Sequence, residues 1–217
     1  MGVLQMGGLM ALFPEKSYSD VAAYMRAYSE EISAAFATID HSQMRAAARV
    51  LEEAVARKAT IFVCGNGGSA SISNHFLCDH MKGVRTGTGV QPKVASLASN
   101  MEIVSAIAND IGYEQVFEFQ LSSLAAPGDV LVAISSSGSS PNIVAALKWA
   151  EANKVASILM SGFSGGAGRE LANISLHVEA HNYGVVEDVH QSLMHILAQF
   201  ARQKMLLDQS QIGLIKF

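Results

Sequence analysis

One segment sets the architecture of this chain, and it reads Thr60-Ile61-Phe62-Val63-Cys64-Gly65-Asn66-Gly67-Gly68-Ser69-Ala70. It starts as an apolar run of strand length, turns through three glycines and then opens a helical pattern. Glycines let a backbone turn sharply and approach a ligand closely, and the free N–H groups at a helix start suit a phosphate. The G-x-G-x-x-G spacing of dinucleotide sites and the lysine of a P-loop are both absent. The loop is therefore either an ordinary tight turn or a phosphate site of another kind.

Four further apolar runs of strand length follow, at residues 93–97, 130–134, 156–160 and 174–178. Most of their positions are apolar rather than alternating, which is typical of strands buried on both faces of a parallel sheet. Helical patterns separate the runs, at residues 70–82, 101–109 with 114–124, 141–153, 168–171 and finally 185–207. The alternation predicts an α/β fold with a doubly wound, flavodoxin-like five-stranded parallel sheet in the order 2-1-3-4-5.

Two amphipathic helical patterns precede the sheet. The first runs to about residue 37 with Ser17 or Ser19 as its cap, and the second covers residues 42–58 with Asp40 or Ser42 as its cap. We expect them to form an N-terminal helical hairpin. The length of 217 residues fits one core. Residues 1–16 are then an N-terminal arm, and residues 17–217 are a single domain that includes the hairpin.

The composition narrows the class of protein. Half of the residues are hydrophobic, 16% are charged, and the net charge is -4. An acidic balance argues against nucleic-acid binding, and no apolar run reaches the 18 or so residues that cross a membrane. Cys64 and Cys78 have no metal-like spacing and suit free thiols in a reducing compartment. We expect a cytoplasmic protein without a membrane partner, whose apolar surplus serves a two-faced sheet or subunit contacts.

A second polar loop, Ser135-Ser136-Ser137-Gly138-Ser139-Ser140, follows the third strand. Strands one and three are neighbours at the switch point of the predicted order, so this loop and the glycine loop should line one crevice. Neither loop holds an arginine, so hydroxyls, backbone N–H groups and helix dipoles would hold an anion there. The alternative is a solvated turn in which Ser140 caps the next helix.

Two helical segments carry further candidates. His75 and Asp79 are four residues apart, and Glu187 and His195 are eight apart with Gln191 between them. A histidine and a carboxylate on one helix face form a metal site, an acid–base pair or a plain surface ion pair. His195 lies in an apolar run and needs a partner if it is buried. His190 is an additional candidate. The pair Asn109-Asp110 is either a helix stop or part of the site.

The motifs together resemble a known family, the sedoheptulose 7-phosphate isomerases, which are SIS-domain (sugar isomerase) enzymes of bacterial heptose synthesis. The likeness runs from about residue 17 to about residue 205. It rests on Gly65-Asn66-Gly67-Gly68-Ser69-Ala70, His75-Phe76, Ala108-Asn109-Asp110, Gly128-Asp129-Val130-Leu131, the serine loop and the segment from Val189-His190 through His195-Ile196-Leu197.

The resemblance implies roles for individual residues. Substrate would contact Asn66, Gly67, Gly68, Ser69 and Glu187, the sugar Asn109 and Asp110, and the phosphate Ser135, Ser136, Ser137 and Ser140. Zinc, one per subunit, would be held by His75, Asp79, Glu187 and His195. Family members are homotetramers with active sites at subunit interfaces. This chain departs from the family at Asp79, where a glutamate is usual, and at Glu187, where a glutamine is usual.

The expected reaction interconverts a ketose phosphate and an aldose phosphate through an enediol, with Asp79 and His195 as the acid–base pair. A different class of function stays open, since some relatives are non-catalytic adaptors that bind the bacterial replication initiator. An adaptor has no need of the acid–base set, so His75, Asp79 and His195 favour an enzyme. A phosphosugar-sensing regulator would carry a DNA-binding domain, for which this chain is too short and too acidic.

Overall fold

The computed structural model describes residues 12–214 and residue 216, so most of the expected N-terminal arm lies outside the described residues. Five strands form one parallel sheet in the order β2-β1-β3-β4-β5. Their bounds are β1 Thr60–Gly65, β2 Lys93–Ser96, β3 Val130–Ser135, β4 Ala156–Ser161 and β5 Ile174–His177. The predicted fold class and strand order are confirmed.

The sheet is buried on both faces because neighbouring residues of each strand enter different cores. Ile61 and Val63 of β1 point into one core, and Phe62 and Cys64 point into the other. All six residues of β3 are buried. This explains why the strands read as continuous apolar runs rather than as alternating ones.

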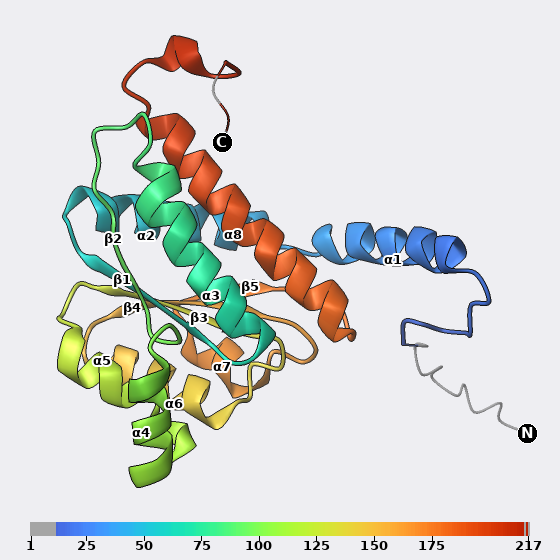
Figure 1. Ribbon diagram of the computed structural model, residues 1–217, viewed down its shortest axis with the longest axis horizontal. Coiled ribbons are helices and arrows are strands. Elements are labelled where there is room, and N and C mark those ends of the chain that lie inside the picture. Colours follow the sequence, from blue (N-terminus) through green and yellow to red (C-terminus); the bar gives the residue numbers. More distant parts are fainter. Residues whose placement is uncertain (1–11, 215, 217) are drawn as a thin grey trace, which may run out of the picture.

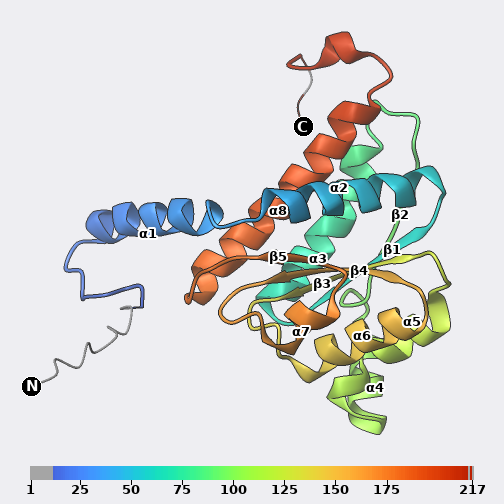
Figure 2. The ribbon, with the colours of Figure 1, turned by 180° about the vertical axis from the view of Figure 1, so that it is seen from behind.

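Helices cover the two faces as separate layers (Figures 1 and 2). One face carries α2 His41–Ala56, α3 Gly68–Cys78 and α8 Tyr183–Met205. The other carries α4 Met101–Asp110, α5 Glu118–Leu124, α6 Pro141–Ala152 and α7 Gly166–Leu171. α7 and α8 each begin two residues before the predicted start. The α8 start is set by Asn182, whose side chain accepts a hydrogen bond from the Val185 N–H.

The first two helices are present, but they do not pack against each other as a hairpin. α1 Val21–Phe36 and α2 follow one another along the molecule, and α1 reaches away from the sheet and contacts α8 near its start (Figure 1). The Tyr28 hydroxyl donates to the Asp188 carboxylate at 2.8 Å across this contact. Asp20 caps α1 instead of Ser17 or Ser19, because its carboxylate reaches two free N–H groups of the first turn. Asp40 caps α2, as one of the two expected residues.

The helix predicted over residues 70–82 has two parts. An α-helix ends at Cys78, and a π-helical turn, η1 Asp79–Val84, continues the chain. Such turns occur often at functional sites. The segment expected as a helix from residue 114 begins as a short 3₁₀ turn, η2 Tyr113–Gln115, and the α-helix starts only at Glu118. Among the described residues, no helix combines the length and the apolar character that a bilayer crossing requires.

His190, on α8, gives the fold a pH dependence. Its ring is wholly buried, and this burial lowers its pKa from 6.5 to about 4, against a smaller opposing effect of the Ser161 backbone. As the pH falls below 6.5, His190 is protonated in the unfolded chain but stays neutral in the folded chain. The free energy of unfolding therefore decreases between pH 6.5 and about pH 4, and His190 does not change it above that range.

We expect the parent protein to lose about 2 kcal/mol more unfolding free energy than the His190→Leu variant between about pH 7.5 and about pH 5. Urea unfolding curves at several pH values measure this difference, and His190→Gln serves if the leucine variant does not fold. Parallel pH profiles for parent and variant would contradict the expectation.

Candidate functional site

The glycine loop joins β1 to α3 at the carboxyl edge of the sheet. Gly67 has a φ of +53°, which favours glycine, and α3 begins at the next residue. Gly65 is equally constrained, because an added Cβ would lie 2.6 Å from the backbone oxygen of Ser69. The Asn66 amide exchanges two hydrogen bonds of 2.9 Å with the Asn142 amide at the start of α6. The loop is thereby clamped to the serine loop's own helix.

The glycine and serine loops meet as predicted, around a small crevice of about 140 Å³. Its lining is polar and consists of Asn66, Ser69, Ile134, Ser135, Ser136, Ser137, Ser140, Tyr183 and Glu187. No lysine or arginine is among these described lining residues. The buried Ser136 hydroxyl has no hydrogen-bond partner within the part of the chain that the structure describes. Neutral donors beside two helix starts suit a phosphate oxygen.

Glu187 of α8 completes the crevice on the side of the glycine loop. Its carboxylate rests on the backbone of Gly68, where an added Cβ would collide with Oε2. Burial raises the pKa of Glu187, and the neighbouring Asp188 charge raises it further. A carboxyl group that is protonated more easily tolerates an anionic ligand nearby better than an ordinary one.

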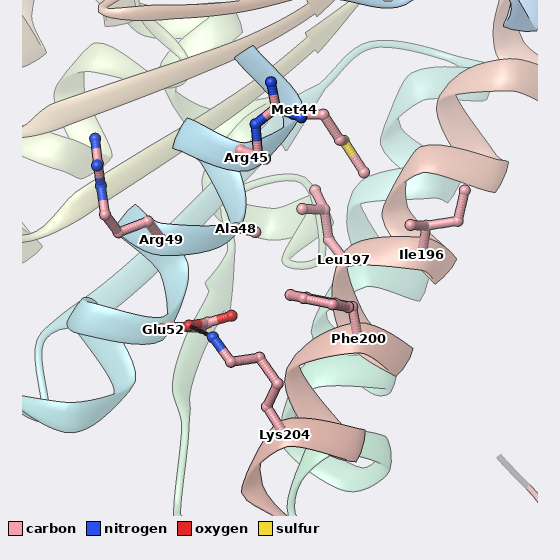
Figure 3. Close-up of a pocket in the computed structure, with 9 residues that line it drawn as sticks. All are labelled: Met44, Arg45, Ala48, Arg49, Glu52, Ile196, Leu197, Phe200 and Lys204. Atoms are coloured by element: carbon pink, nitrogen blue, oxygen red, sulfur yellow. Dashed lines mark hydrogen bonds and ion pairs between the residues drawn. The ribbon is translucent and has the colours of Figure 1, made fainter. Parts of the chain in front are cut away.

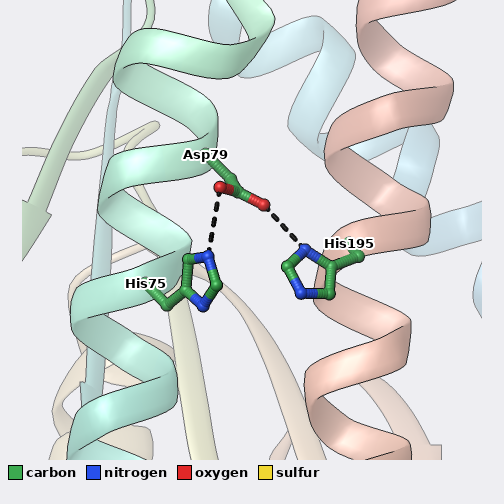
Figure 4. Close-up of side chains that lie close together, drawn as sticks. All are labelled: His75, Asp79 and His195. Atoms are coloured by element: carbon green, nitrogen blue, oxygen red, sulfur yellow. Dashed lines mark hydrogen bonds and ion pairs between the residues drawn. The ribbon is translucent and has the colours of Figure 1, made fainter. Parts of the chain in front are cut away.

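A second cluster lies further along α3 and α8 and joins His75, Asp79 and His195 (Figure 4). Asp79 Oδ2 is 2.8 Å from His195 Nδ1, and Asp79 Oδ1 is 3.4 Å from His75 Nε2. One ligand atom from each residue lies within 4.8 Å of the others. Two imidazoles and a carboxylate make a donor set that fits one divalent cation such as zinc. The same three groups also fit an acid–base pair with a supporting histidine.

Glu187 is not part of this cluster, although the resemblance implies it as the fourth ligand. The position between the rings belongs to Gln191, whose amide nitrogen lies 3.0 Å from His75 Nδ1 and 3.0 Å from His195 Nε2. Gln191 is four residues from both Glu187 and His195, so the sequence places all three on one face of α8. This spacing is the feature of the sequence that indicates the contact of Gln191 with the histidines.

The structure leaves two other predicted positions outside the crevice. Asn109 and Asp110 end α4 on the exposed surface and bond to each other at 2.7 Å. The segment after them does reach the site, because the Tyr113 hydroxyl donates to the Asn66 side chain at 2.9 Å. His190 lines neither the crevice nor the histidine cluster. Three further residues of the site have no distinctive spacing in the sequence and were not among the predicted positions: Tyr113, Asn142 and Tyr183.

A cavity of about 320 Å³ opens on the histidine cluster between η1 and α8. Beyond the three cluster residues it is lined by Cys78, Lys82, Gly83, Ala198, Gln199 and Arg202. The crevice and this cavity lie along the same elements. Ser69 of α3 and Glu187 of α8 line the crevice, whereas Asp79, the first residue of η1 after α3, and His195, in the middle of α8, line the cavity. The arrangement suits a molecule with an anionic end and a reacting end.

The chain belongs to the class of SIS-domain proteins, since residues 23–162 match the SIS domain. The phosphoheptose isomerase of Solidesulfovibrio magneticus is 35% identical over 79% of this chain and 85% of its own length. That of Nitratidesulfovibrio vulgaris is 39% identical over 67% of this chain and 69% of its own length. The structure of phosphoheptose isomerase GmhA from Neisseria gonorrhoeae superposes with a TM-score of 0.76 at 27% identity, covering 83% of this chain and 96% of that chain. The chain belongs to the phosphoheptose isomerase family, as the sequence motifs predicted.

The constraint at Gly65 yields a test of the loop. In Gly65→Ala, the new methyl group meets the Ser69 backbone, so the start of α3 must shift. We expect a loss of about 1–3 kcal/mol in unfolding free energy, typical of overpacking. Gly89→Ala is the matched control, because its methyl group would lie 3.4 Å from the Leu207 side chain, an ordinary contact. Equal urea midpoints for the two variants would refute the close packing of the loop.

Proposed function

We propose that this sugar-phosphate isomerase interconverts sedoheptulose 7-phosphate and an aldose heptose 7-phosphate through an enediol. The observation that carries the proposal is the Asp79–His195 pair, which joins η1 to α8 beside a crevice of neutral donors between α3 and α8. Relatives over most of the chain's length are named phosphoheptose isomerases, which supports the seven-carbon substrate. An adaptor that only binds a partner protein has no use for the pair.

The crevice holds the phosphate end of the substrate in this proposal. The hydroxyls of Ser135, Ser136, Ser137 and Ser140 donate to its oxygens, together with free N–H groups where α3 and α6 begin. Asn66, Gly67, Gly68, Ser69 and Glu187 contact the adjoining part of the sugar. Asn109 and Asp110 reach the sugar only if the end of α4 moves or if substrate extends toward the surface there, so we assign them an outer role.

The cluster carries out the proton transfers. The Asp79 carboxylate removes a proton from C1 of the ketose, and the electron pair left behind forms the C1–C2 double bond while the carbonyl oxygen takes a proton from His195. In the second half His195 takes the O1 proton as the aldehyde forms, which restores the proton it gave up, and Asp79 returns its proton to C2. The 2.8 Å contact between the two side chains keeps them in register for both halves.

We assign one zinc ion per subunit to His75, Asp79 and His195, with Glu187 on the substrate instead. When bound, the ion supplies a positive charge that polarises the carbonyl oxygen and stabilises the enediolate. The residues themselves orient the carbonyl and move the protons. We place the enzyme in the cytoplasm, in agreement with two free cysteines, and the net charge of -4 argues against a nucleic-acid partner.

Exchange of carbon-bound hydrogen with heavy water tests the reaction directly. Sedoheptulose 7-phosphate incubated with the enzyme should take up deuterium, and Asp79→Asn should slow the uptake by about 10²–10⁴-fold because the base is lost. Asp79→Glu keeps the carboxylate and should retain much of the activity. If the parent exchanges no deuterium into five- to seven-carbon sugar phosphates, the enzymatic proposal fails.

The serine loop has its own test. Ser137→Ala with Ser140→Ala removes two donors to a charged group, so we expect phosphosugar binding to weaken by about 1–3 kcal/mol in calorimetry. Ser139→Ala is the control, because Ser139 is exposed and lies outside the lining of the crevice. Unchanged affinity in the double variant would move the phosphate to another site.

We further propose that the enzyme works as a homotetramer with its active sites at subunit interfaces. α1 reaches out from the body with apolar side chains in solvent, including Val21 at 83% and Met25 at 62% exposure. An apolar groove of about 440 Å³ lies between α2 and α8 (Figure 3). Its floor contains Met44, Ala48, Leu197 and Phe200. Surfaces of this kind mark protein contacts.

Light scattering tests the assembly. The parent should have a mass well above the 23.0 kDa of one chain at micromolar concentration. Met25→Asp and Phe200→Asp place a charge on each apolar surface and should lower the mass, since a buried unpaired charge opposes association. Lys148→Glu on the exposed surface of α6 should leave the mass unchanged. A parent mass of one chain would exclude the tetramer.

A further inference from the structure

Gln191 closes a ring of four side chains that spans α3 and α8. Its amide nitrogen is 3.0 Å from His75 Nδ1 and 3.0 Å from His195 Nε2. The opposite nitrogens of the two rings face Asp79, at 3.4 Å for His75 Nε2 and 2.8 Å for His195 Nδ1. Each imidazole therefore lies between the amide and the carboxylate, with one nitrogen toward each.

One placement of the protons on the four side chains satisfies all four contacts. A carboxylate only accepts hydrogen bonds, whereas an amide NH₂ donates two. With the NH₂ group between the rings, His75 Nδ1 and His195 Nε2 must both accept. The ring protons then sit on His75 Nε2 and His195 Nδ1, which point at the Asp79 oxygens. In this arrangement the amide holds the two rings in these tautomers.

The Gln191 amide can also hold both imidazoles in the opposite orientation. If the amide rotates by half a turn, its oxygen faces both rings and accepts N–H bonds from His75 Nδ1 and His195 Nε2. The lone pairs then lie on His75 Nε2 and His195 Nδ1, on the side of Asp79, where a cation would need them. Histidines that bind a metal usually donate their other N–H to an oxygen in this way.

We propose that Gln191 is the positioning residue of the cluster, and that its amide turns over when the cluster takes up a divalent cation. In the contacts that the structure shows it donates to both imidazoles, and in the protein loaded with a cation it accepts from both. Gln191 thus fixes which nitrogen of each ring faces Asp79 in either state. The positioning role of Gln191 stands on these contacts alone, and the turnover of its amide rests on the zinc proposed above.

Histidine ¹⁵N spectra of the full chain test both halves. In chelator-treated parent protein, the unprotonated nitrogens should be His75 Nδ1 and His195 Nε2, and their signals should move in Gln191→Met, which keeps the length but removes the amide. Signals that do not respond to Gln191→Met would overturn the proposal. Saturating zinc should move the ring protons of the parent onto those same two nitrogens, and protons that stay in place would overturn the turnover of the amide.

Zinc affinity, measured by competition with a chromogenic chelator, separates a positioning role from a structural one. Gln191→Met should bind zinc about 10–100-fold more weakly, because it cannot accept from either ring. Gln191→Glu should recover most of this loss, since a carboxylate oxygen accepts both N–H bonds. Ser192→Ala, on the exposed side of α8, is the control and should match the parent. Equal zinc affinities for Gln191→Met and the parent would overturn the proposal. A parent that binds no zinc would refute the zinc site and the turnover of the amide, and the histidine spectra would then test the positioning role of Gln191 by themselves.

Discussion

The pairing of β1 with β3 carries the rest of this structure. Gly65 is opposite Ile134 in the register of the two strands, so the loops after β1 and β3 leave the sheet at the same edge. The glycine loop and the serine loop are far apart in sequence, yet this pairing makes them the two walls of one crevice. The exchange of hydrogen bonds between Asn66 and Asn142 then locks the walls together. Without this pairing, each loop would be an ordinary polar turn.

A second contact, between α3 with η1 and α8, assembles the reactive groups. The two helices cross the same face of the sheet, and their facing sides bring Asp79 within 2.8 Å of His195. The change from α-helix to π-helical turn begins at Asp79, the residue that also shortens the family's usual glutamate. The cluster therefore combines a shorter carboxylate with a local change of helix type, and Gln191 fills the space between its two imidazoles.

The crevice has an unusual distribution of charge for the phosphate site that we propose there. The crevice offers hydroxyls, backbone N–H groups and helix starts, and among its described lining residues Glu187 supplies a carboxylate, whose pKa is raised by burial. Neutral hydrogen-bond donors bind an anion mainly through the geometry of the hydrogen bonds. They attract other anions less strongly than a lysine or an arginine would, because they carry no net charge. Glu187 thus sets the charge of the crevice and lies outside the histidine cluster.

The amino-acid pattern alone determined the sheet, its strand order and the meeting of the two loops, because strands buried on both faces and glycine-rich or serine-rich βα turns have local signatures. It also determined that His75 and Asp79 share a helix face. Only the tertiary structure decided that α1 contacts the start of α8, that Asp20 caps α1, and that Asn109 and Asp110 are exposed. It also decided that Gln191, and not Glu187, lies beside the histidines. Each of these depends on how one helix is rotated and placed against another. Spacing within a helix reveals which residues share a stripe, but only packing selects which of them meets the neighbouring helix.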